Sequence, residues 1–264
     1  MAASIPLELS TGRGWLVGFR NMVSKEYASW WRTRRWLVHL LLWLFVINAF
    51  LFLIGTDEAV YRGHDPYETL GELLQVFFQV GGLFAAIGIV VTTQSAVVGE
   101  RELGTAEWVL SKPVSRPAFL LSKLLVNGLS FLFLAVAVPS VVFYLQTLLH
   151  AYLQPPLLPF LAGIGIHVLH LAFYLTLTLA LGTLFPSRGP VSGIAIGLLF
   201  AGLILPNFVP SLVQWTPAGL MTLAARTARE LSLPDGWYMP LIATGLWSLL
   251  FVLVALRKFE REEL

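Results

Sequence analysis

The sequence predicts an all-α integral membrane protein, and its composition and the spacing of its charges are the two observations that predict it. Hydrophobic residues make up 57% of the chain and charged residues 12%, and the mean hydropathy is +0.77. A soluble protein of 264 residues must cover its surface with polar groups, so it could not absorb this much apolar surface. The chain is therefore expected in a bilayer.

The charges are concentrated in a few segments. Residues 73–99 and 124–187 contain no Asp, Glu, Lys or Arg, whereas the intervening stretch GERELGTAEWVLSKPVSRPAFLLSK, residues 99–123, contains seven. There is no cysteine, which excludes disulfides and thiolate metal sites. The charged stretch therefore interrupts two long membrane-compatible regions.

Six segments have the length and composition of transmembrane helices, which need about 20 apolar residues to cross the hydrocarbon core. They cover residues 36–55, 73–98, 117–149, 160–185, 191–206 and 237–256. Three prolines in HAYLQPPLLP separate the third span from the fourth, because proline cannot continue a helix. The motif PSRGP, Pro186 to Pro190, forms the tight turn before the fifth span. Trp237 and Tyr238 are placed to anchor the last span at the membrane surface.

The distribution of Lys and Arg predicts the orientation. If the spans alternate and the N-terminus is cytoplasmic, 14 of the 17 Lys and Arg residues lie on the cytoplasmic side. Positive charge is enriched in cytoplasmic segments. We therefore expect residues 1–35, residues 99–123 and the tail 257–264 in the cytoplasm.

Two segments outside the spans are also apolar. Residues 15–31 alternate apolar and polar residues at helical spacing, which is typical of an amphipathic helix in the membrane plane; packing on the protein itself is the alternative. Residues 207–236 are too interrupted by proline to span, and we expect a re-entrant or interfacial element on the outer side.

The charged stretch predicts a helix, a turn, a short helix over residues 105–112, a second turn and another helix. Gly104 can end the second span in a left-handed conformation. Thr105 is a good N-cap, with Glu107 in the first turn. Pro113 ends the short helix, and Ser115 can cap the third span. A helix this short is unstable alone and needs a surface to dock on.

This pattern resembles the intracellular signature of ABC-2-type permeases, the membrane subunits of ABC exporters. That signature reads Glu-Arg-x-x-Gly-Thr, a short helix, Ser-x-Pro-(Val)-Ser-Arg and a Lys at the foot of the next span. The matching residues are Glu100, Arg101, Gly104, Thr105, Ser111, Pro113, Ser115, Arg116 and Lys123. Among these permeases, the chain resembles the compact ones grouped with those that serve copper-enzyme maturation.

The resemblance implies a multi-pass protein of a prokaryotic inner membrane, with an ABC-2 or type V exporter-like fold. The short helix would be a coupling helix that docks on a separate ATPase subunit. ATP and Mg²⁺ would bind to that partner, because the sequence contains no G-x-x-x-x-G-K-[ST] motif. A second permease subunit, either an identical copy or a sister protein, would complete the pathway within the membrane lipids. No cofactor, metal or nucleic acid is expected in this chain.

We assign ATPase binding to Trp108, Val109 and Leu110, flanked by Lys112 and Arg116. Stiff connection to the spans is assigned to the Gly104–Thr105 turn and Pro113. Because Glu100 and Glu102 lie at the membrane edge, we expect them to pair with arginines near the N-terminal helix. The expected coupling residues are Glu100, Arg101, Glu102, Gly104, Thr105, Glu107, Trp108, Val109, Leu110, Lys112, Pro113 and Arg116; the arginines near the N-terminal helix are Arg32, Arg34 and Arg35.

Small and polar residues within the spans suggest further roles. Gly189, Gly193, Gly197 and Ala201 recur every four residues, a spacing that allows close packing of membrane helices, either between two subunits or within one. Gln75 and Gln79 share a helix face and could line a pathway. The absence of an ionisable cluster in the spans favours a lipid-like or amphipathic cargo, or a mechanical role.

Other protein classes are less well supported. His167 and His170 are three residues apart, yet two histidines without a carboxylate in the same span make a poor metal site or proton relay, and hydrogen bonding between helices is the alternative. An intramembrane protease would need H-E-x-x-H or G-x-S-G, and the chain has His167-Val-Leu-His170 and Pro190-Val-Ser-Gly193 instead. A channel or a non-transporting membrane component is the other alternative.

Overall fold

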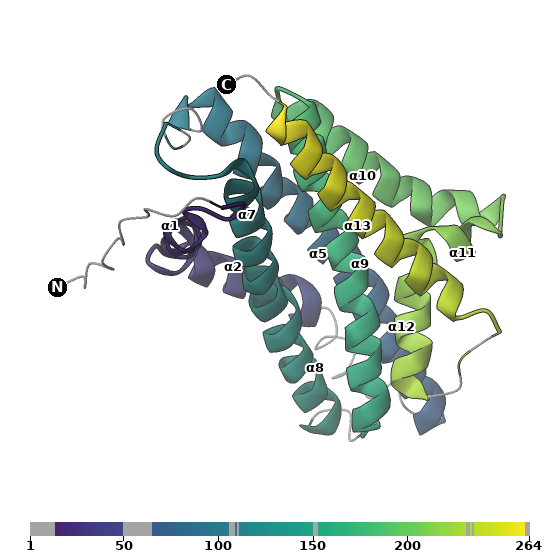
Figure 1. The fold of residues 1–264 in the computed structure, drawn as a ribbon. Helices are drawn as coiled ribbons and strands as arrows, with labels where there is room; N and C mark the ends of the chain where they lie inside the picture. Colours follow the sequence, from purple (N-terminus) through teal and green to yellow (C-terminus); the bar gives the residue numbers. More distant parts are fainter. Residues whose placement is uncertain are drawn as a thin grey trace.

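The computed structural model describes residues 14–49, 65–105, 109, 111–149, 153–230, 233 and 235–261, and the regular elements in these ranges are helices. The α-helices of this part of the chain are α1 (Phe19–Trp31), α2 (Arg35–Leu44), α5 (Pro66–Glu102), α7 (Arg116–Phe131), α8 (Val138–Leu149), α9 (Leu157–Leu184), α10 (Arg188–Ile204), α11 (Leu212–Trp215), α12 (Leu220–Arg229) and α13 (Tyr238–Glu260). Figure 1 shows the long helices side by side in one bundle.

Five described helical segments are long and apolar enough to cross a membrane, namely Pro66–Glu102, Arg116–Leu149, Leu157–Leu184, Arg188–Asn207 and Tyr238–Glu260. They overlap the second to sixth predicted spans. Of the first predicted span, 36–55, the described part is the apolar helix Arg35–Ala49, and residues 50–55 lie outside the described residues. An all-helical membrane protein is confirmed, while the count of six stays a prediction.

The third span contains a π-helical segment, Leu132–Ala137, between α7 and α8. Pro139 follows two residues later, and it has no N–H to donate to the carbonyl four residues before it. A π turn has wider i→i+5 hydrogen bonding and holds one extra residue. The wide turn accommodates the proline, so Arg116–Leu149 continues as one span.

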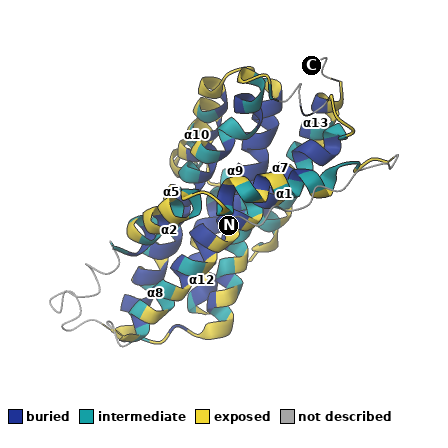
Figure 2. Ribbon diagram, turned by 90° about the vertical axis from the view of Figure 1, so that its left-hand side faces the viewer, coloured by how far each residue is buried: buried dark blue, intermediate teal, exposed yellow. Residues whose placement is uncertain are grey.

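Helix α9 forms the centre of the bundle, where it packs against α5, α12 and α13. Figure 2 shows buried residues along the interior of the bundle and exposed ones on its outer faces. The ring of Phe77 stacks on Phe143 at 4.3 Å, and Phe160 lies 5.8 Å from Phe143, which joins α5, α8 and α9. By contrast, α10 and α13 are mostly exposed to the bundle's surroundings.

Helix α1 runs across the bundle rather than along it (Figures 1 and 2) and packs against α7. Met22 and Trp30 are buried, and the Trp30 indole nitrogen donates to the Asn127 side-chain oxygen at 3.0 Å. On the other side Trp15 and Tyr27 are 58% and 50% exposed. The amphipathic segment thus has one apolar strip packed on the protein and another available to lipid.

The region predicted as an outer element folds into short helical pieces, including α11 and α12. Helix α12 packs between α5 and α9, with Leu220, Ala224 and Ala228 fully buried. A side chain at Gly163 of α9 would place its Cβ 2.6 Å from the Ala224 carbonyl oxygen. Glycine at this position therefore permits the close approach of α12.

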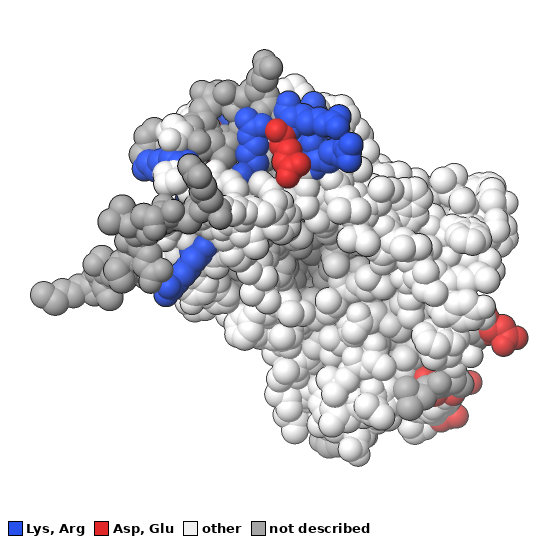
Figure 3. Space-filling model, in the orientation of Figure 1, with Lys and Arg blue, Asp and Glu red and all other residues white. Residues whose placement is uncertain are grey.

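Charged side chains lie at the two ends of the bundle. In Figure 3 Lys and Arg gather at the end that carries the loop between α5 and α7, and a broad band without charge separates them from the acidic side chains at the far end. The band is the surface that hydrocarbon chains would contact.

Candidate functional site

The candidate functional site is the junction around the loop between α5 and α7. Helix α5 ends at Glu102, and Gly104 follows with φ of +64°. No atom of the described residues lies within 4 Å of a Cβ placed on Gly104, so the left-handed backbone conformation is the observed reason for glycine there. Thr105 is helical, and its hydroxyl donates to the Glu100 carbonyl oxygen at 3.1 Å. The predicted left-handed end of the span is therefore present.

Only part of the predicted coupling helix is described. Glu107, Trp108 and Leu110 lie outside the described residues, and Thr105 and Val109 are helical. Val109 is 6% exposed and belongs to the hydrophobic core of this chain. Its side chain is thus placed against the permease itself, whereas Lys112 and Pro113 are exposed.

The C-terminal end of the loop, at Ser115, is hydrogen-bonded to the segment before α1. Ser115 caps α7 as predicted, because its side chain accepts from the Ala118 amide at 3.2 Å. The Ser115 hydroxyl also donates to the Trp15 carbonyl at 2.6 Å, and its amide donates to the Val17 carbonyl at 2.9 Å. Gly18 has φ of +78°, and a Cβ on it would lie 2.9 Å from Val114. The loop and the start of α1 therefore share one small interface.

A buried ion cluster lies directly beneath this interface. The Lys123 ammonium is 2.8 Å from a carboxylate oxygen of Glu26 and 2.8 Å from one of Glu100, and the Lys123 side chain is 2% exposed. Lys25 makes a second ion pair with Glu100 at 2.9 Å. One basic residue of α7 thus joins carboxylates of α1 and α5.

These pairs differ from the expected ones. Glu100 pairs with Lys25 and Lys123, and Glu102 pairs with Arg188 of α10 at 2.7 Å. The expected partners were Arg32, Arg34 and Arg35. The difference follows from the direction of α1, which brings the middle of that helix, rather than its end, to α5.

Two arginines beside the loop contact the ends of other spans. Arg101 donates to the carbonyls of Gly182 and Thr183, at 3.2 and 3.4 Å, in the last turn of α9. Arg116 donates to the carbonyls of Phe259 and Glu260, at 3.4 and 2.5 Å, at the end of α13. The last carbonyls of a helix have no partner within it, and they carry partial negative charge. Arg116 was expected at the surface that binds the ATPase, but its guanidinium makes hydrogen bonds within this chain.

One feature of the sequence does indicate the ion cluster, namely an acidic residue on an apolar helix face. Met22, Glu26 and Trp30 are spaced by four and lie on the buried face of α1. A carboxylate on an otherwise apolar face requires a buried basic partner. The contacts of Arg101 and Arg116 join residues 81 to 144 positions apart, and nothing local in the sequence indicates them.

The remaining candidates lie elsewhere in the spans. Added Cβ atoms at Gly189, Gly193 and Gly197 would meet no atom within 4 Å, and Ala201 is half-buried. The glycine face is thus not used for packing among the described residues of this subunit.

The two glutamines have different surroundings. The Gln79 amide nitrogen is 3.4 Å from the Thr222 hydroxyl, and Gln79 lines a cavity of about 680 Å³. Gln75 is exposed and is not among the residues that line this cavity. Of the two glutamines only Gln79 therefore lines this cavity, and a pathway role for either stays a prediction.

The histidine pair lies in the middle of α9. His167 and His170 stack with ring centroids 6.4 Å apart, and His170 Nδ1 lies 3.3 Å from the Pro217 carbonyl oxygen. Within the described ranges no group of three or more His, Cys, Asp or Glu residues could hold a metal ion. His170 thus contacts the segment before α12, whereas His167 packs against Phe78 of α5, with the ring centroids 5.7 Å apart.

The family model described as "ABC-2 family transporter protein" matches residues 20–264 of the chain. The protein belongs to the ABC-2 transporter family. The membership agrees with the charged junction and the membrane spans, and it makes the chain a membrane permease component of an ABC transporter. A curated relative, "Uncharacterized transmembrane protein YxlG" of Bacillus subtilis (strain 168), is 25% identical over 162 residues. This match covers 61% of the present chain and 57% of the relative.

Proposed function

We propose that this ABC-2 permease works in an ATP-driven exporter, where it couples ATP hydrolysis by a separate ATPase subunit to the movement of a substrate. ATP and Mg²⁺ bind to that partner. The observation that supports the proposal is the junction itself: an exposed loop whose two flanking arginines contact the ends of α9 and α13. Movement of this loop is transmitted directly to α9 through Arg101, to α10 through Glu102 and to α13 through Arg116. It also reaches the start of α1 through Ser115. Rigid-body coupling requires direct contacts of this kind.

The ATPase docks on the exposed face of the loop, away from the helix bundle. Lys112 and Pro113 are exposed there, and Trp108 and Leu110 of the sequence supply apolar contact. Docking anchors of this kind are often worth about 2 kcal/mol or more. The buried Val109 and the internally bonded Arg116 hold the loop in place instead.

A second permease subunit packs on the glycine face of α10. The face is free among the described residues, and small residues let two membrane helices approach closely. Both chain termini and the loop lie in the cytoplasm of a prokaryotic cell, as the charge distribution favours. A cysteine introduced at Lys112 should then be labelled only from the cytoplasmic side, and the chain has no native cysteine to interfere.

Co-purification tests the proposal. Affinity-tagged permease from its native membrane should bring down an ATPase and Mg²⁺-dependent ATP hydrolysis. Trp108→Ala and Lys112→Glu should reduce both by tenfold or more. Lys258→Glu is the matched control, because Lys258 is an exposed cation at the same end of the bundle. Absence of an ATPase from the unaltered permease would favour the intramembrane enzyme or channel alternatives, whereas an ATPase retained by both loop variants would show that the loop is not its docking site.

A further inference from the structure

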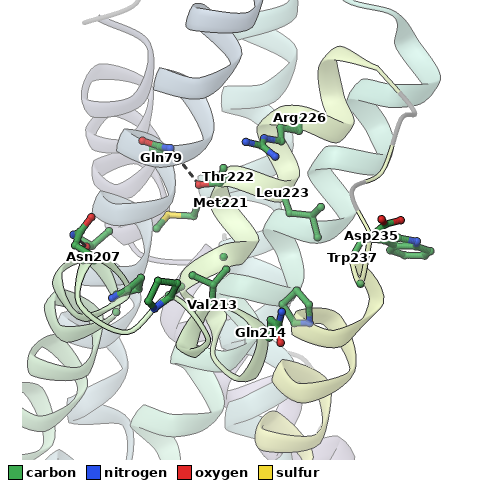
Figure 4. A pocket seen from close by; sticks show the side chains of 18 residues that line it. Gln79, Asn207, Val213, Gln214, Met221, Thr222, Leu223, Arg226, Asp235 and Trp237 are labelled. Atoms are coloured by element: carbon green, nitrogen blue, oxygen red, sulfur yellow. Dashed lines mark hydrogen bonds between the residues drawn. The ribbon is translucent and has the colours of Figure 1, made fainter.

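The cavity beside Gln79 lies at the end of the bundle opposite the loop between α5 and α7. Its walls come from α5, the end of α10, α11, α12 and the segment before α13 (Figure 4). The span Arg188–Asn207 has 20 residues, roughly 30 Å of helix, which matches the hydrocarbon thickness. Because Arg188 pairs with Glu102 at the loop end, Asn207 on the cavity wall lies near the other membrane surface.

Helix α12 directs its one exposed face into this cavity. From Leu220 to Ala228 every residue is buried except Thr222 and Arg226, and both of these line the cavity. They are four residues apart, so they are neighbours on one helix face, with Cβ atoms about 5–6 Å apart. From α5, the Gln79 amide nitrogen donates to the Thr222 hydroxyl oxygen at 3.4 Å. In Figure 4 these three side chains lie together at one end of the cavity.

The three side chains offer hydrogen-bond donors that no group in the described part of the chain uses. The Arg226 guanidinium has no hydrogen-bond, ion-pair or ring partner there. Arg229, three residues later, differs because its guanidinium lies over the Tyr67 ring at 3.7 Å. The Thr222 hydroxyl accepts from Gln79 and keeps its own hydrogen, and the Gln79 amide keeps a second N–H. An unpaired arginine beside two further donors is a suitable site for an oxyanion.

The acidic residues nearby do not occupy this site. Asp235 lines the cavity, but in Figure 4 the Asp235 and Trp237 side chains are directed away from the other lining residues and lie apart from Arg226. The Glu230 carboxylate, just beyond α12, accepts from the Tyr67 hydroxyl at 2.8 Å instead. Of the two charged residues that line the cavity, Arg226 is therefore the one placed to bind a ligand.

Apolar side chains line the cavity beyond the donors. In the view of Figure 4 they lie below the donor cluster, and they are Val213, Met221 and Leu223. A second cavity of about 150 Å³, with mainly apolar walls, shares with the first the residues Gly202, Pro206 and Ala218. The first cavity has a volume of about 680 Å³, within the range of sites for small organic ligands. It can therefore hold a polar head group together with part of an apolar chain.

We infer that this cavity binds an anionic phospholipid of the adjacent membrane surface. Arg226 binds the lipid phosphate through paired N–H groups, and Thr222 and Gln79 donate to it as well. The apolar side chains beyond them contact the start of the acyl chain. A phospholipid fits better than a free anion because the donors and the apolar wall belong to one cavity near the membrane surface. This binding does not depend on the ATPase of the proposed function.

Photocrosslinking can locate the lipid on purified permease in neutral detergent without its ATPase. The probe is lysophosphatidylglycerol with a diazirine on its single acyl chain, and crosslinked peptides are identified by mass spectrometry. We expect crosslinks in residues 212–223, which supply the apolar wall. Unlabelled lysophosphatidylglycerol should compete about tenfold better than two neutral or chainless analogues. These are monoacylglycerol of the same chain length, which has no charge, and glycerol 3-phosphate, which has no acyl chain.

Arg226→Gln should lower the crosslink yield in residues 212–223 about tenfold, and Arg226→Lys, which keeps the charge, should retain most of it. Arg229→Gln is the matched control, because it removes the same charge from the same helix but from a side chain that lies over Tyr67. Crosslinks near the Lys and Arg residues of the loop end serve as an internal control and should not change. Arg226 is exposed, so elution and thermal midpoint should also stay unchanged.

The inference is overturned if the unaltered chain gives no crosslink in residues 212–223, or if Arg226→Gln keeps the full yield or loses no more than Arg229→Gln does. Equal competition by monoacylglycerol would show an apolar groove that does not recognise the phosphate. Equal competition by glycerol 3-phosphate would show a small-anion site without a lipid chain, and both results contradict the inference. The ATPase should co-purify with every variant, so failure of lipid binding is distinguishable from failure of the proposed coupling.

Discussion

The Lys123 ammonium and the Glu26 carboxylate are 2.8 Å apart with both side chains nearly inaccessible to solvent. Glu100 accepts from the same ammonium, so α1 is joined to α5 and α7 by one cation. An ion cluster of this kind depends strongly on each member, because the removal of one leaves the others buried and uncompensated.

Lys123→Met should therefore destabilise the permease by about 3–5 kcal/mol, because two carboxylates lose their shared partner. The effect is measured as the shift in the thermal midpoint in detergent, with size-exclusion chromatography used to monitor the folded fraction. Lys25→Met is the control, since the Lys25 side chain is 44% exposed and exposed pairs contribute less than about 1 kcal/mol. Equal losses in the two variants would mean that burial of the cluster does not determine its contribution.

Gly104→Val should strain the end of α5. A β-branched residue in the left-handed region costs roughly 1–2 kcal/mol, and no atom of the described residues lies within 4 Å of the new Cβ. We expect the ATPase to remain bound and its hydrolysis to lose stimulation by substrate. Gly104→Asn keeps the same φ more easily and should behave nearly as the unaltered chain does. The amount of bound ATPase and its hydrolysis rate are the measurements, and equal behaviour of the Val and Asn variants would contradict a role for the turn.

Arg101 and Arg116 should act on different helices. Arg116→Ala removes the donors at the end of α13, so amide hydrogen exchange should rise there and not in the last turn of α9. Arg101→Ala should raise exchange mainly in the last turn of α9, where its guanidinium donates to the Gly182 and Thr183 carbonyls, and less at the end of α13, where it lies 5.7 Å from the centre of the Phe259 ring. Each variant is thus the control for the other. A uniform increase at both helix ends would indicate general loosening rather than two separate contacts.

Gly193→Leu should weaken pairing of permease subunits while the subunit itself stays folded. No atom of the described residues of its own subunit lies within 4 Å of the added Cβ, so we expect its bulk to act on whatever packs against α10. Chemical crosslinking in detergent measures the dimer fraction. Gly165→Leu is the control, since Gly165 is an equally unobstructed glycine on α9. An unchanged dimer fraction would assign the glycine face to lipid contact.

The sequence predicted those features of the junction that depend on neighbouring residues. The left-handed Gly104 and the Ser115 cap are examples, because their causes lie within a few positions. The second span begins at Pro66 instead of residue 73 because Asp65 caps it, accepting from the Tyr67 amide at 2.9 Å, and the helix extends beyond its apolar part. Hydropathy marks only the portion of a helix that lies in hydrocarbon.

The contacts missed by sequence reasoning are those between distant segments. Arg116 reaches the end of α13, and α1 meets α5 through Lys25. These depend on the direction in which each helix packs, which no local pattern determines. The same holds for Arg226 and Asp235, which line one cavity although they belong to different segments.

The π turn at Leu132–Ala137 has a consequence for how this chain is compared with its relatives. A wide turn is a helix that has accepted one inserted residue while keeping its axis. Residues of α7 and α8 are therefore out of phase with a single 3.6-residue repeat, and a helical wheel drawn through both misplaces the faces of one of them. A relative that lacks both the extra residue and Pro139 could form a regular span of the same length, and an alignment of the two should carry its one-residue gap within this turn.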